Sequence, residues 1–244
     1  AAFYDGIQKL DESELDAFLE KHSDILEEIE ELPAKYEDSL GFLDPDEWAS
    51  DEALARVEEL AARVREHAEA FVIIGVGGSN NAARAVIKAL EKQDAPKVYY
   101  AGNSLSPHAM NRVLEEVKGK SLYINVIAKN FETLEPGVGF RVFRRYLKEQ
   151  YKEEAGERII VTGTAGSCLH QLCKKHGYAF LPFPDNMGGR YSAVCNVGLF
   201  PMAVAGMDVR KLVSGAKDMR KLLLTAKGKE NPAYLYGAVR NLLF

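Results

Sequence analysis

The sequence predicts an α/β fold in which helices cover both faces of a five-stranded parallel sheet. Short apolar runs alternate with helical patterns between residues 70 and 187, and this alternation is typical of parallel strands joined by crossover helices. Helical periodicity without strands precedes and follows that stretch. Right-handed crossovers leave few topologies, and we expect the doubly wound strand order 2-1-3-4-5.

Two amphipathic helices are expected before the first strand. In the first, apolar residues recur at helical spacing between Leu15 and Ile29, and Ser13 is placed to cap its start. Pro33 interrupts the pattern, and a second helix is expected from about Asp51 to Glu69. We therefore expect residues 1–69 to form a helical segment in front of the sheet.

The α/β domain is expected from residue 70 to residue 187, and its first strand, Phe71–Val76, has the short apolar run of a strand buried on both faces. The strands are expected at Phe71–Val76, Lys97–Ala101, Leu122–Ala128, Arg158–Thr162 and Ala179–Pro182. The helices between them are expected at Ser79–Glu91, Ser106–Val117, Glu135–Glu154 and Ala165–His176. Each strand but the last thus leads into a helix that returns across the sheet.

Helical patterns return in residues 188–244. The stretch Ala193–Ala205 is almost wholly apolar, so we expect it to be deeply buried. Further helices are expected at Val209–Leu224 and Tyr234–Leu243. The chain ends at Phe244 inside an apolar pattern without a cap or polar tail. From this we expect a truncated chain whose residues 188–244 connect toward a missing second domain.

Composition argues against several classes of function. Hydrophobic residues make up 47% of the chain and charged residues 27%, as in ordinary soluble globular proteins. The net charge of -5 argues against a nucleic-acid partner, which needs a concentrated basic surface. We interpret the one local basic excess, between Arg141 and Lys152, as the solvated face of a helix. The longest apolar run, Ala70–Val76, is far shorter than the roughly 20 residues of a membrane span.

Cysteine and histidine positions give no sign of a metal site. Cys168, Cys173 and Cys195 fit neither a redox motif nor the usual zinc spacings. An odd number of scattered cysteines is typical of reduced thiols in a cytoplasmic protein, and we interpret them as small buried side chains. The five histidines are not grouped at any ligand spacing, so no metal is expected.

The first candidate site is Gly75-Val-Gly-Gly-Ser79, between the first strand and the following helix. Glycines let backbone amides approach an anion, and a helix N-terminus adds partial positive charge. Asn80 stands where the dinucleotide-binding fingerprint requires a third glycine. No Gly-Lys-Ser/Thr follows, which excludes a P-loop. The motif therefore indicates either an anion site or tight packing of the strand against the helix.

The second candidate site is the segment Ala128–Pro136, after the third strand. With the order 2-1-3, the loops after strands one and three flank the point where open sheets bind ligands. Lys129, Asn130 and Thr133 carry groups that can donate to a phosphate. The alternative is a solvated surface loop.

The third candidate site is Asp185–Ser192, after the fifth strand. Gly188 and Gly189 place Arg190 in a turn ahead of the buried apolar stretch. An arginine is always charged and can stabilise a negatively charged oxygen. The alternative is an arginine that pairs with a surface acid.

Taken together, these segments resemble a known family. GVGGS, AKNFETLEPGVGFRVF and DNMGGRYSAVCNVGLFPMAVAGMD closely resemble the shorter bacterial type of glucose-6-phosphate isomerase, and the final NPAYLYGAVRNLLF is also similar to that family. The resemblance extends from about Trp48 to Phe244. It implies the first of two sugar-isomerase (SIS) domains with a flavodoxin-like strand order. It also implies a cytoplasmic enzyme of glycolysis and gluconeogenesis that is a homodimer at full length.

The resemblance also implies roles for individual residues. Hexose 6-phosphate would be bound by Gly77, Gly78, Ser79, Lys129, Asn130, Thr133 and Gly189. Arg190 would stabilise the enediolate while a carboxylate base moves a proton between C2 and C1. No metal or organic cofactor is implied. The family's base, a glutamate, belongs to the second domain and has no counterpart in this chain.

The phosphate loop departs from the family pattern, typically SKSGTTTEP. Ala128 and Asn130 stand where hydroxyl side chains are usual, and Glu132 replaces a threonine. These departures favour the alternative function, a non-catalytic phosphosugar-binding or regulatory SIS module. The intact Gly-Gly-Arg segment favours the isomerase.

Overall fold

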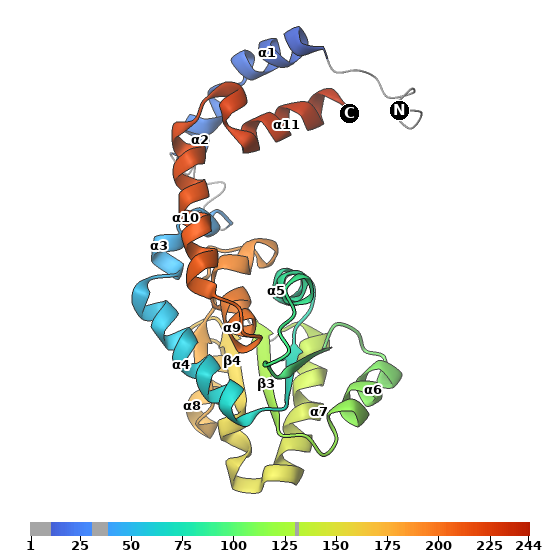
Figure 1. The fold of residues 1–244 in the computed structure, drawn as a ribbon. Helices are drawn as coiled ribbons and strands as arrows, with labels where there is room; N and C mark the ends of the chain where they lie inside the picture. Colours follow the sequence, from blue (N-terminus) through green and yellow to red (C-terminus); the bar gives the residue numbers. More distant parts are fainter. Residues whose placement is uncertain (1–10, 31–38, 130–131) are drawn as a thin grey trace. The chain divides into compact units, whose positions relative to one another are not determined.

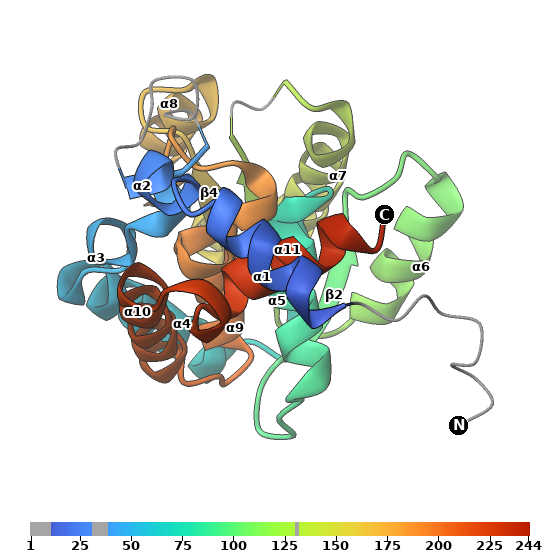
Figure 2. The same ribbon diagram turned by 90° about the horizontal axis from the view of Figure 1, so that it is seen from above.

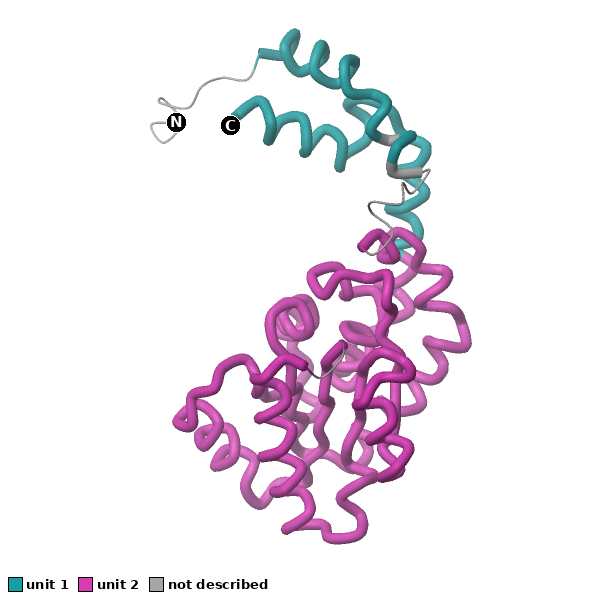
Figure 3. Tube along the Cα trace, turned by 180° about the vertical axis from the view of Figure 1, so that it is seen from behind, with its two compact units in different colours: residues 1–37, 215–244 teal, residues 38–214 magenta. Residues whose placement is uncertain are grey.

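A computed structural model of the chain describes residues 11–30, 39–129 and 132–244 (Figure 1). The chain forms two compact units, residues 38–214 and residues 1–37 with 215–244 (Figure 3). We call the first the sheet unit and the second the helical unit. The segments expected from the sequence, 1–69, 70–187 and 188–244, divide the chain at other positions and remain predictions.

The sheet unit contains a five-stranded parallel sheet in the order β2-β1-β3-β4-β5, which confirms the predicted topology. Its strands are β1 (Ala70–Ile74), β2 (Lys97–Ala101), β3 (Leu122–Ala128), β4 (Ile159–Gly163) and β5 (Ala179–Pro182). In the centre of the sheet, Val72 of β1 pairs with Tyr99 of β2 and with Ile124 of β3. Because all strands run in one direction, their carboxyl ends lie at one edge of the sheet.

Helices cover both faces of this sheet, as Figure 2 shows. One face is covered by α6 (Pro107–Val117), α7 (Leu134–Tyr151) and α8 (Cys168–His176). The other face is covered by α4 (Asp51–His67), α5 (Gly78–Ala89) and α9 (Asn196–Val204). The unit also contains α3 (Pro45–Trp48), the first residues of α10 (Val209–Thr225), and the short 3-10 helices η2 (Gly41–Leu43), η3 (Lys152–Arg158) and η4 (Gly189–Val194).

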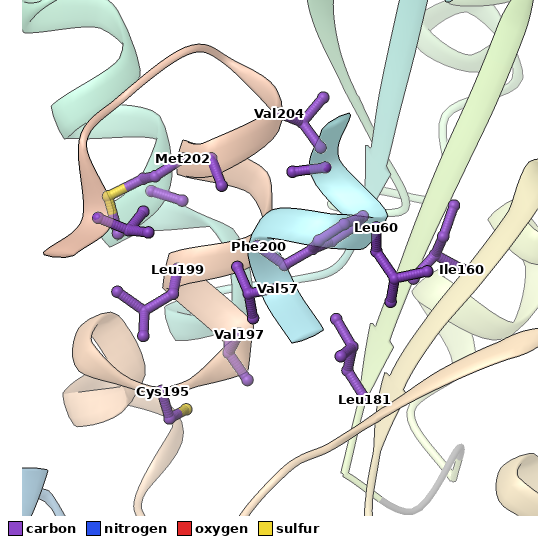
Figure 4. Packing of buried hydrophobic residues seen from close by; sticks show 14 of the residues in the cluster. Val57, Leu60, Ile160, Leu181, Cys195, Val197, Leu199, Phe200, Met202 and Val204 are labelled. Atoms are coloured by element: carbon purple, nitrogen blue, oxygen red, sulfur yellow. The ribbon is translucent and has the colours of Figure 1, made fainter. Parts of the chain in front are cut away.

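Helix α9 is the central helix on the face of the sheet that α4 and α5 also cover. All nine of its residues are buried, which confirms the burial predicted for this apolar stretch. Phe200 lies against Val57 and Leu60 of α4 (Figure 4), and its ring meets the ring of Phe71 edge-on at 5.9 Å. At the first turn of α9, the amide of Asn196 donates to the carbonyl oxygen at the end of β5, 2.9 Å away. The turn that precedes α9 is therefore held at the carboxyl edge of the sheet.

The helical unit contains α1 (Glu12–Lys21), α2 (Ile25–Glu30), the rest of α10, η5 (Gly228–Glu230) and α11 (Pro232–Leu242). Helices α1 and α11 bury Leu19 and Tyr234 against each other, and the Tyr234 hydroxyl donates to the Leu19 carbonyl oxygen at 2.5 Å. Lys229 pairs with Asp16 at 2.6 Å and with Glu12 at 3.1 Å. The N-terminal helix α1 is thus joined to the C-terminal segment, η5 and α11, by apolar packing and by ion pairs.

Two details of the first helix differ from the prediction. Asp11, not Ser13, caps α1: its carboxylate accepts from the backbone amide and the hydroxyl of Ser13, each at 2.8 Å. A carboxylate at this position also interacts favourably with the helix dipole. The periodic stretch predicted as one helix is two, because His22–Asp24 forms a turn between α1 and α2. Serine and aspartate there compete with helical backbone hydrogen bonds.

Candidate functional site

The turn between β1 and α5 is formed by the glycines of the first motif. Gly77 is the N-cap of α5 and has a φ of +57°, in the left-handed region that glycine adopts at low cost. A Cβ at Gly77 would meet nothing within 4 Å, so backbone conformation requires this glycine. Asn80 is 2% exposed, and its side-chain amide donates to the Gly75 carbonyl oxygen at 2.8 Å. That hydrogen bond links the two ends of the turn, residues 75 and 80, so that Ser79 is held within it.

The loop after β3 brings a lysine and a helix N-terminus to the same edge of the sheet. The Lys129 ammonium donates to the backbone carbonyl oxygen of Asp185 at 2.7 Å and lies 5.8 Å from the centre of the Phe183 ring. Thr133 occupies the N-cap position of α7, but its side chain makes no capping hydrogen bond. Its exposed hydroxyl can therefore donate to a bound anion. Asn130 lies outside the described residues.

The turn after β5 presents an exposed arginine. Within η4, the Ser192 hydroxyl donates to the Gly189 carbonyl oxygen at 2.8 Å. The ring of Tyr191 stacks on Phe42, with ring centres 4.7 Å apart. Arg190 lies between Gly189 and Tyr191, which these two contacts hold, and it makes no ion pair with any residue that the structure describes. Pairing with a surface acid, the alternative reason for this arginine, finds no support in the described part of the chain.

The three motifs lie together at the carboxyl edge of the sheet. Gly78 packs so closely against the third motif that a Cβ there would lie 2.1 Å from the carbonyl oxygen of Gly189. Between them, Lys129 holds the backbone of Asp185. The segment after β5 thus runs back across the edge of the sheet, past the loop after β3, to the start of α5. Gly77–Ser79 and Gly189–Arg190 thereby become neighbours, although two strands separate β1 from β5.

Sequence reasoning missed one supporting segment, Leu40–Phe42. The amide of Gly41 donates to the Asn186 carbonyl oxygen at 2.9 Å, and Leu40 forms an isolated antiparallel bridge with Met187. A Cβ at Gly41 would lie 2.4 Å from the side-chain oxygen of Asn186. A single bridge is too short to give the alternation of apolar and polar residues that marks a strand. In the sequence, only the glycine at position 41 could have indicated this contact.

The chemistry that these groups offer is anion binding. Within the described ranges, no group of three or more histidine, cysteine, aspartate or glutamate side chains could hold a metal ion. Cys168 is exposed, unlike the buried side chain expected, whereas burial raises the pKa of Cys173 to about 11 and that of Cys195 to about 12. Both buried thiols are protonated at neutral pH. A lysine, an arginine and two helix N-termini remain, and these suit a phosphate-bearing ligand.

The contact between the two glycine turns can be tested by a pair of substitutions. Gly78→Ala is expected to reduce the free energy of unfolding by roughly 1–3 kcal/mol, because the new methyl group overlaps backbone that cannot move cheaply. Gly189→Ala is the matched control: its Cβ would meet nothing within 4 Å, and a change within about 0.5 kcal/mol is expected. Denaturant unfolding measures both. Equal losses in the two variants would contradict the close packing of the turns.

Comparison with known proteins gives a consistent result. Residues 56–242 match the family model described as phosphoglucose isomerase. A protein named glucose-6-phosphate isomerase from Shouchella clausii is 37% identical over 228 residues, which cover 88% of this chain and 51% of that protein. Its namesake from Clostridium novyi is 40% identical over 220 residues, or 85% of this chain and 49% of that protein. The chain thus spans about half the length of the curated relatives it matches.

Solved structures share the fold. A hypothetical protein from Thermus thermophilus superposes with a TM-score of 0.83 and 26% identity, covering 96% of this chain and 57% of that one. A glucose-6-phosphate isomerase from Chlamydia trachomatis superposes with a TM-score of 0.78 and 20% identity, covering 97% of this chain and 52% of that one. At this level of identity the second comparison establishes the fold alone.

Proposed function

The chain belongs to the phosphoglucose isomerase family, and from this we propose that it forms one half of an isomerase that interconverts glucose 6-phosphate and fructose 6-phosphate. The reaction would proceed through a cis-enediol, as a step shared by glycolysis and gluconeogenesis. The observation that carries the proposal is the meeting of three anion-suited turns at the carboxyl edge of the sheet. Ligands of open α/β sheets bind at this edge.

The phosphate would be held between the turn after β1 and the loop after β3. Gly77, Gly78 and Ser79 offer backbone amides and a hydroxyl at the N-terminus of α5. From the other side would come the Lys129 ammonium and the Thr133 hydroxyl. Asn130, the next residue in the sequence after Lys129, is proposed as a further donor to the phosphate. On binding, Lys129 would exchange the neutral Asp185 carbonyl oxygen for a charged phosphate oxygen, which is the stronger acceptor.

The reacting carbons would lie beside the turn after β5. Gly189 would contact the sugar, and the Arg190 guanidinium would face the oxygen that becomes negative as the enediolate forms. The backbone on both sides of Arg190 is held: the Gly189 carbonyl oxygen accepts from the Ser192 hydroxyl, and the Tyr191 ring stacks on Phe42. A fixed backbone lets the charge meet the transition state without reorganisation.

The proton would be moved by a group outside these residues. The carboxylates closest to the site in sequence are Glu132, Glu135 and Asp185. The first two flank Thr133 on the phosphate side, and the backbone of the third is tied to Lys129. We propose that the base is a glutamate in the second half that the curated relatives have. We call the protein that combines both halves the two-half enzyme, and propose that it is a cytoplasmic homodimer.

The mechanism proposed here uses only side chains and backbone amides. Proton transfer through an enediol requires a base and a stabilised oxyanion, so no metal or organic cofactor is assigned. Neither a nucleic acid nor a membrane is proposed as a partner. Each helix in the described part of the chain falls short of what crossing a membrane requires.

A second candidate function is a phosphosugar-binding module without catalysis. The observation in its favour is the altered phosphate loop, with Ala128 and Asn130 where hydroxyls are usual and Glu132 in place of a threonine. Both functions require the same phosphate site. They differ in turnover, which only the isomerase would show once both halves are present.

Calorimetric titration of the 244-residue chain with fructose 6-phosphate tests the shared requirement. We expect weak binding, because each lost hydroxyl removes a charged hydrogen bond worth about 1.5–3 kcal/mol. Lys129→Ala is expected to weaken the affinity further, by roughly ten- to a hundred-fold. Lys88→Ala, a control at the far end of α5, should leave the affinity unchanged. Equal affinity of the Lys129→Ala variant and the parent chain would remove Lys129 from the site.

A further inference from the structure

One face of α7 carries a concentration of positive charge that the proposed isomerase does not use. Arg141, Arg144, Arg145 and Lys148 occupy positions i, i+3, i+4 and i+7, so they share one face of the helix. Together with Glu149 they line a shallow hollow of about 310 Å³. The four cations extend along roughly 10 Å of helix axis. The hollow has the size of a small ligand site.

A second helix contributes to this face. The Nε of Arg144 donates to the Tyr178 hydroxyl at 2.8 Å, and its Nη2 lies 3.1 Å from Nε2 of His176. The His176 ring in turn stacks on the ring of Tyr178, with centres 5.5 Å apart. His176 ends α8, whose last turn also carries Lys174 and Lys175. Arg144 is thus held in place by residues from outside α7, as a preorganised cation.

Placing these cations together has a cost to the fold. Like charges four residues apart destabilise a helix, and this face contains two such pairs, Arg141 with Arg145 and Arg144 with Lys148. Glu149 pairs with Arg145 at 2.7 Å and offsets one charge. The hollow thus carries four cations and one carboxylate, or about three net positive charges, in a chain whose net charge is -5. A solvated surface helix would gain from more mixed charges, so a bound anion accounts better for the arrangement.

The environment of His176 reports the same positive potential. Burial, Arg144, Lys148 and Lys175 together lower the pKa of this histidine. Backbone of η3 also packs here, since a Cβ at Gly156 would lie 3.2 Å from the His176 carbonyl oxygen. In this structure Nε2 of His176 faces an arginine N–H and acts as the acceptor. The ring is therefore neutral and would gain a proton more readily once an anion offset the surrounding charge.

We propose that this face of α7 binds a small oligophosphate, a ligand with a chain of two or three phosphate groups. Guanidinium groups bind phosphate oxygens through paired N–H donors, and a line of four cations matches a chain of phosphates better than a single one. The site is distinct from the proposed sugar-phosphate site. Thr133 precedes α7, and Arg141 lies eight residues farther on, or about 12 Å along the helix axis.

Calorimetry at low salt, where screening is weak, tests the proposal with inorganic triphosphate and the 244-residue chain. Combining Arg144→Ala with Lys148→Ala is expected to weaken binding by about ten-fold or more. The matched control combines Arg56→Ala with Arg65→Ala on α4, which removes the same charge elsewhere. Unchanged melting temperatures of both variants would show that the fold is intact. Equal losses in the two double variants, or no binding by the parent chain, would overturn the proposal.

Nuclear magnetic resonance of the histidines gives an independent readout. Triphosphate is expected to raise the pKa of His176 toward its ordinary value of 6.5 or beyond, whereas the resonances of His108 on α6 should not respond. Fructose 6-phosphate at the sugar site should leave His176 unaffected. ATP that binds as tightly as triphosphate would identify the phosphate chain as the recognised group. Tighter binding of ATP would support the site and show that it also contacts the nucleoside. Equal affinity for inorganic monophosphate, or tighter binding of duplex DNA, would contradict an oligophosphate site.

Discussion

Replacing Arg190 with alanine in the two-half enzyme is expected to lower kcat on the order of 10²–10³-fold, as the loss of one oxyanion donor does in other enzymes. KM should change far less, because we propose that the sugar phosphate is bound mainly through its phosphate, at the other end of the site. An interaction made chiefly in the transition state lowers kcat and kcat/KM together. Steady-state kinetics in the direction of fructose 6-phosphate conversion measures both constants.

The structure gives two reasons to expect little loss of stability from this substitution. The Arg190 side chain is exposed and forms no ion pair within the described ranges. The turn around it is held by Ser192 and by the stacking of Tyr191 on Phe42, and neither contact involves the guanidinium. The melting temperature should therefore stay close to that of the parent enzyme.

Arg190→Lys provides the matched control. It keeps the positive charge but loses the planar fork of donors, so its kcat should lie between those of the parent and the alanine variant. A lower melting temperature with unchanged turnover of the folded fraction, in the alanine variant, would mean that Arg190 has a structural role only.

Much of the sheet could be predicted because its inner strands β1, β3 and β4 are buried along their whole length. Such strands give short, nearly continuous apolar runs, and the bounds predicted for β2, β3 and β5 are those observed. The strand order was predicted from the handedness of crossovers and from the doubly wound arrangement, and the structure confirms it. Helix ends were less predictable. For example, α7 ends at Tyr151, and the chain continues into the 3-10 helix η3 instead of extending α7 to Glu154.

The contacts that assemble the site could not be predicted in the same way. Lys129 and Asp185 are 56 residues apart, and the hydrogen bond between them depends on the course of the segment after β5 across the sheet edge. The approach of Gly78 to Gly189 has the same origin. Composition and periodicity identify which groups could bind an anion, but they carry no information about such pairings. The sequence could indicate the three motifs, whereas their arrangement required the fold.

The second large effect concerns the chain by itself: the 244-residue chain is expected to show no measurable isomerase activity. Abstraction of the C2 proton needs a base within hydrogen-bond reach, and such a base typically contributes about 10²–10⁴-fold to the rate. Glu132 and Glu135 belong to the segment Ala128–Pro136 after the third strand, which in the proposed site holds the phosphate at the opposite end of the substrate from the carbons that react. Lacking the carboxylate proposed for the second half, the chain would bind the sugar phosphate without isomerising it.

Asp185 is the best internal substitute for that base, because it precedes the Arg190 turn. Its backbone already accepts the Lys129 hydrogen bond, and an aspartate before two glycines commonly fixes a turn through its own backbone. We therefore expect Asp185→Asn to leave the inactive chain unchanged and the two-half enzyme largely active. A coupled assay of fructose 6-phosphate conversion, on the purified chain and then on the chain mixed with a C-terminal half like that of its relatives, measures both. Activity should appear only in the mixture. Turnover by the chain alone, abolished by Asp185→Asn, would identify Asp185 as the base and overturn the assignment to the second half.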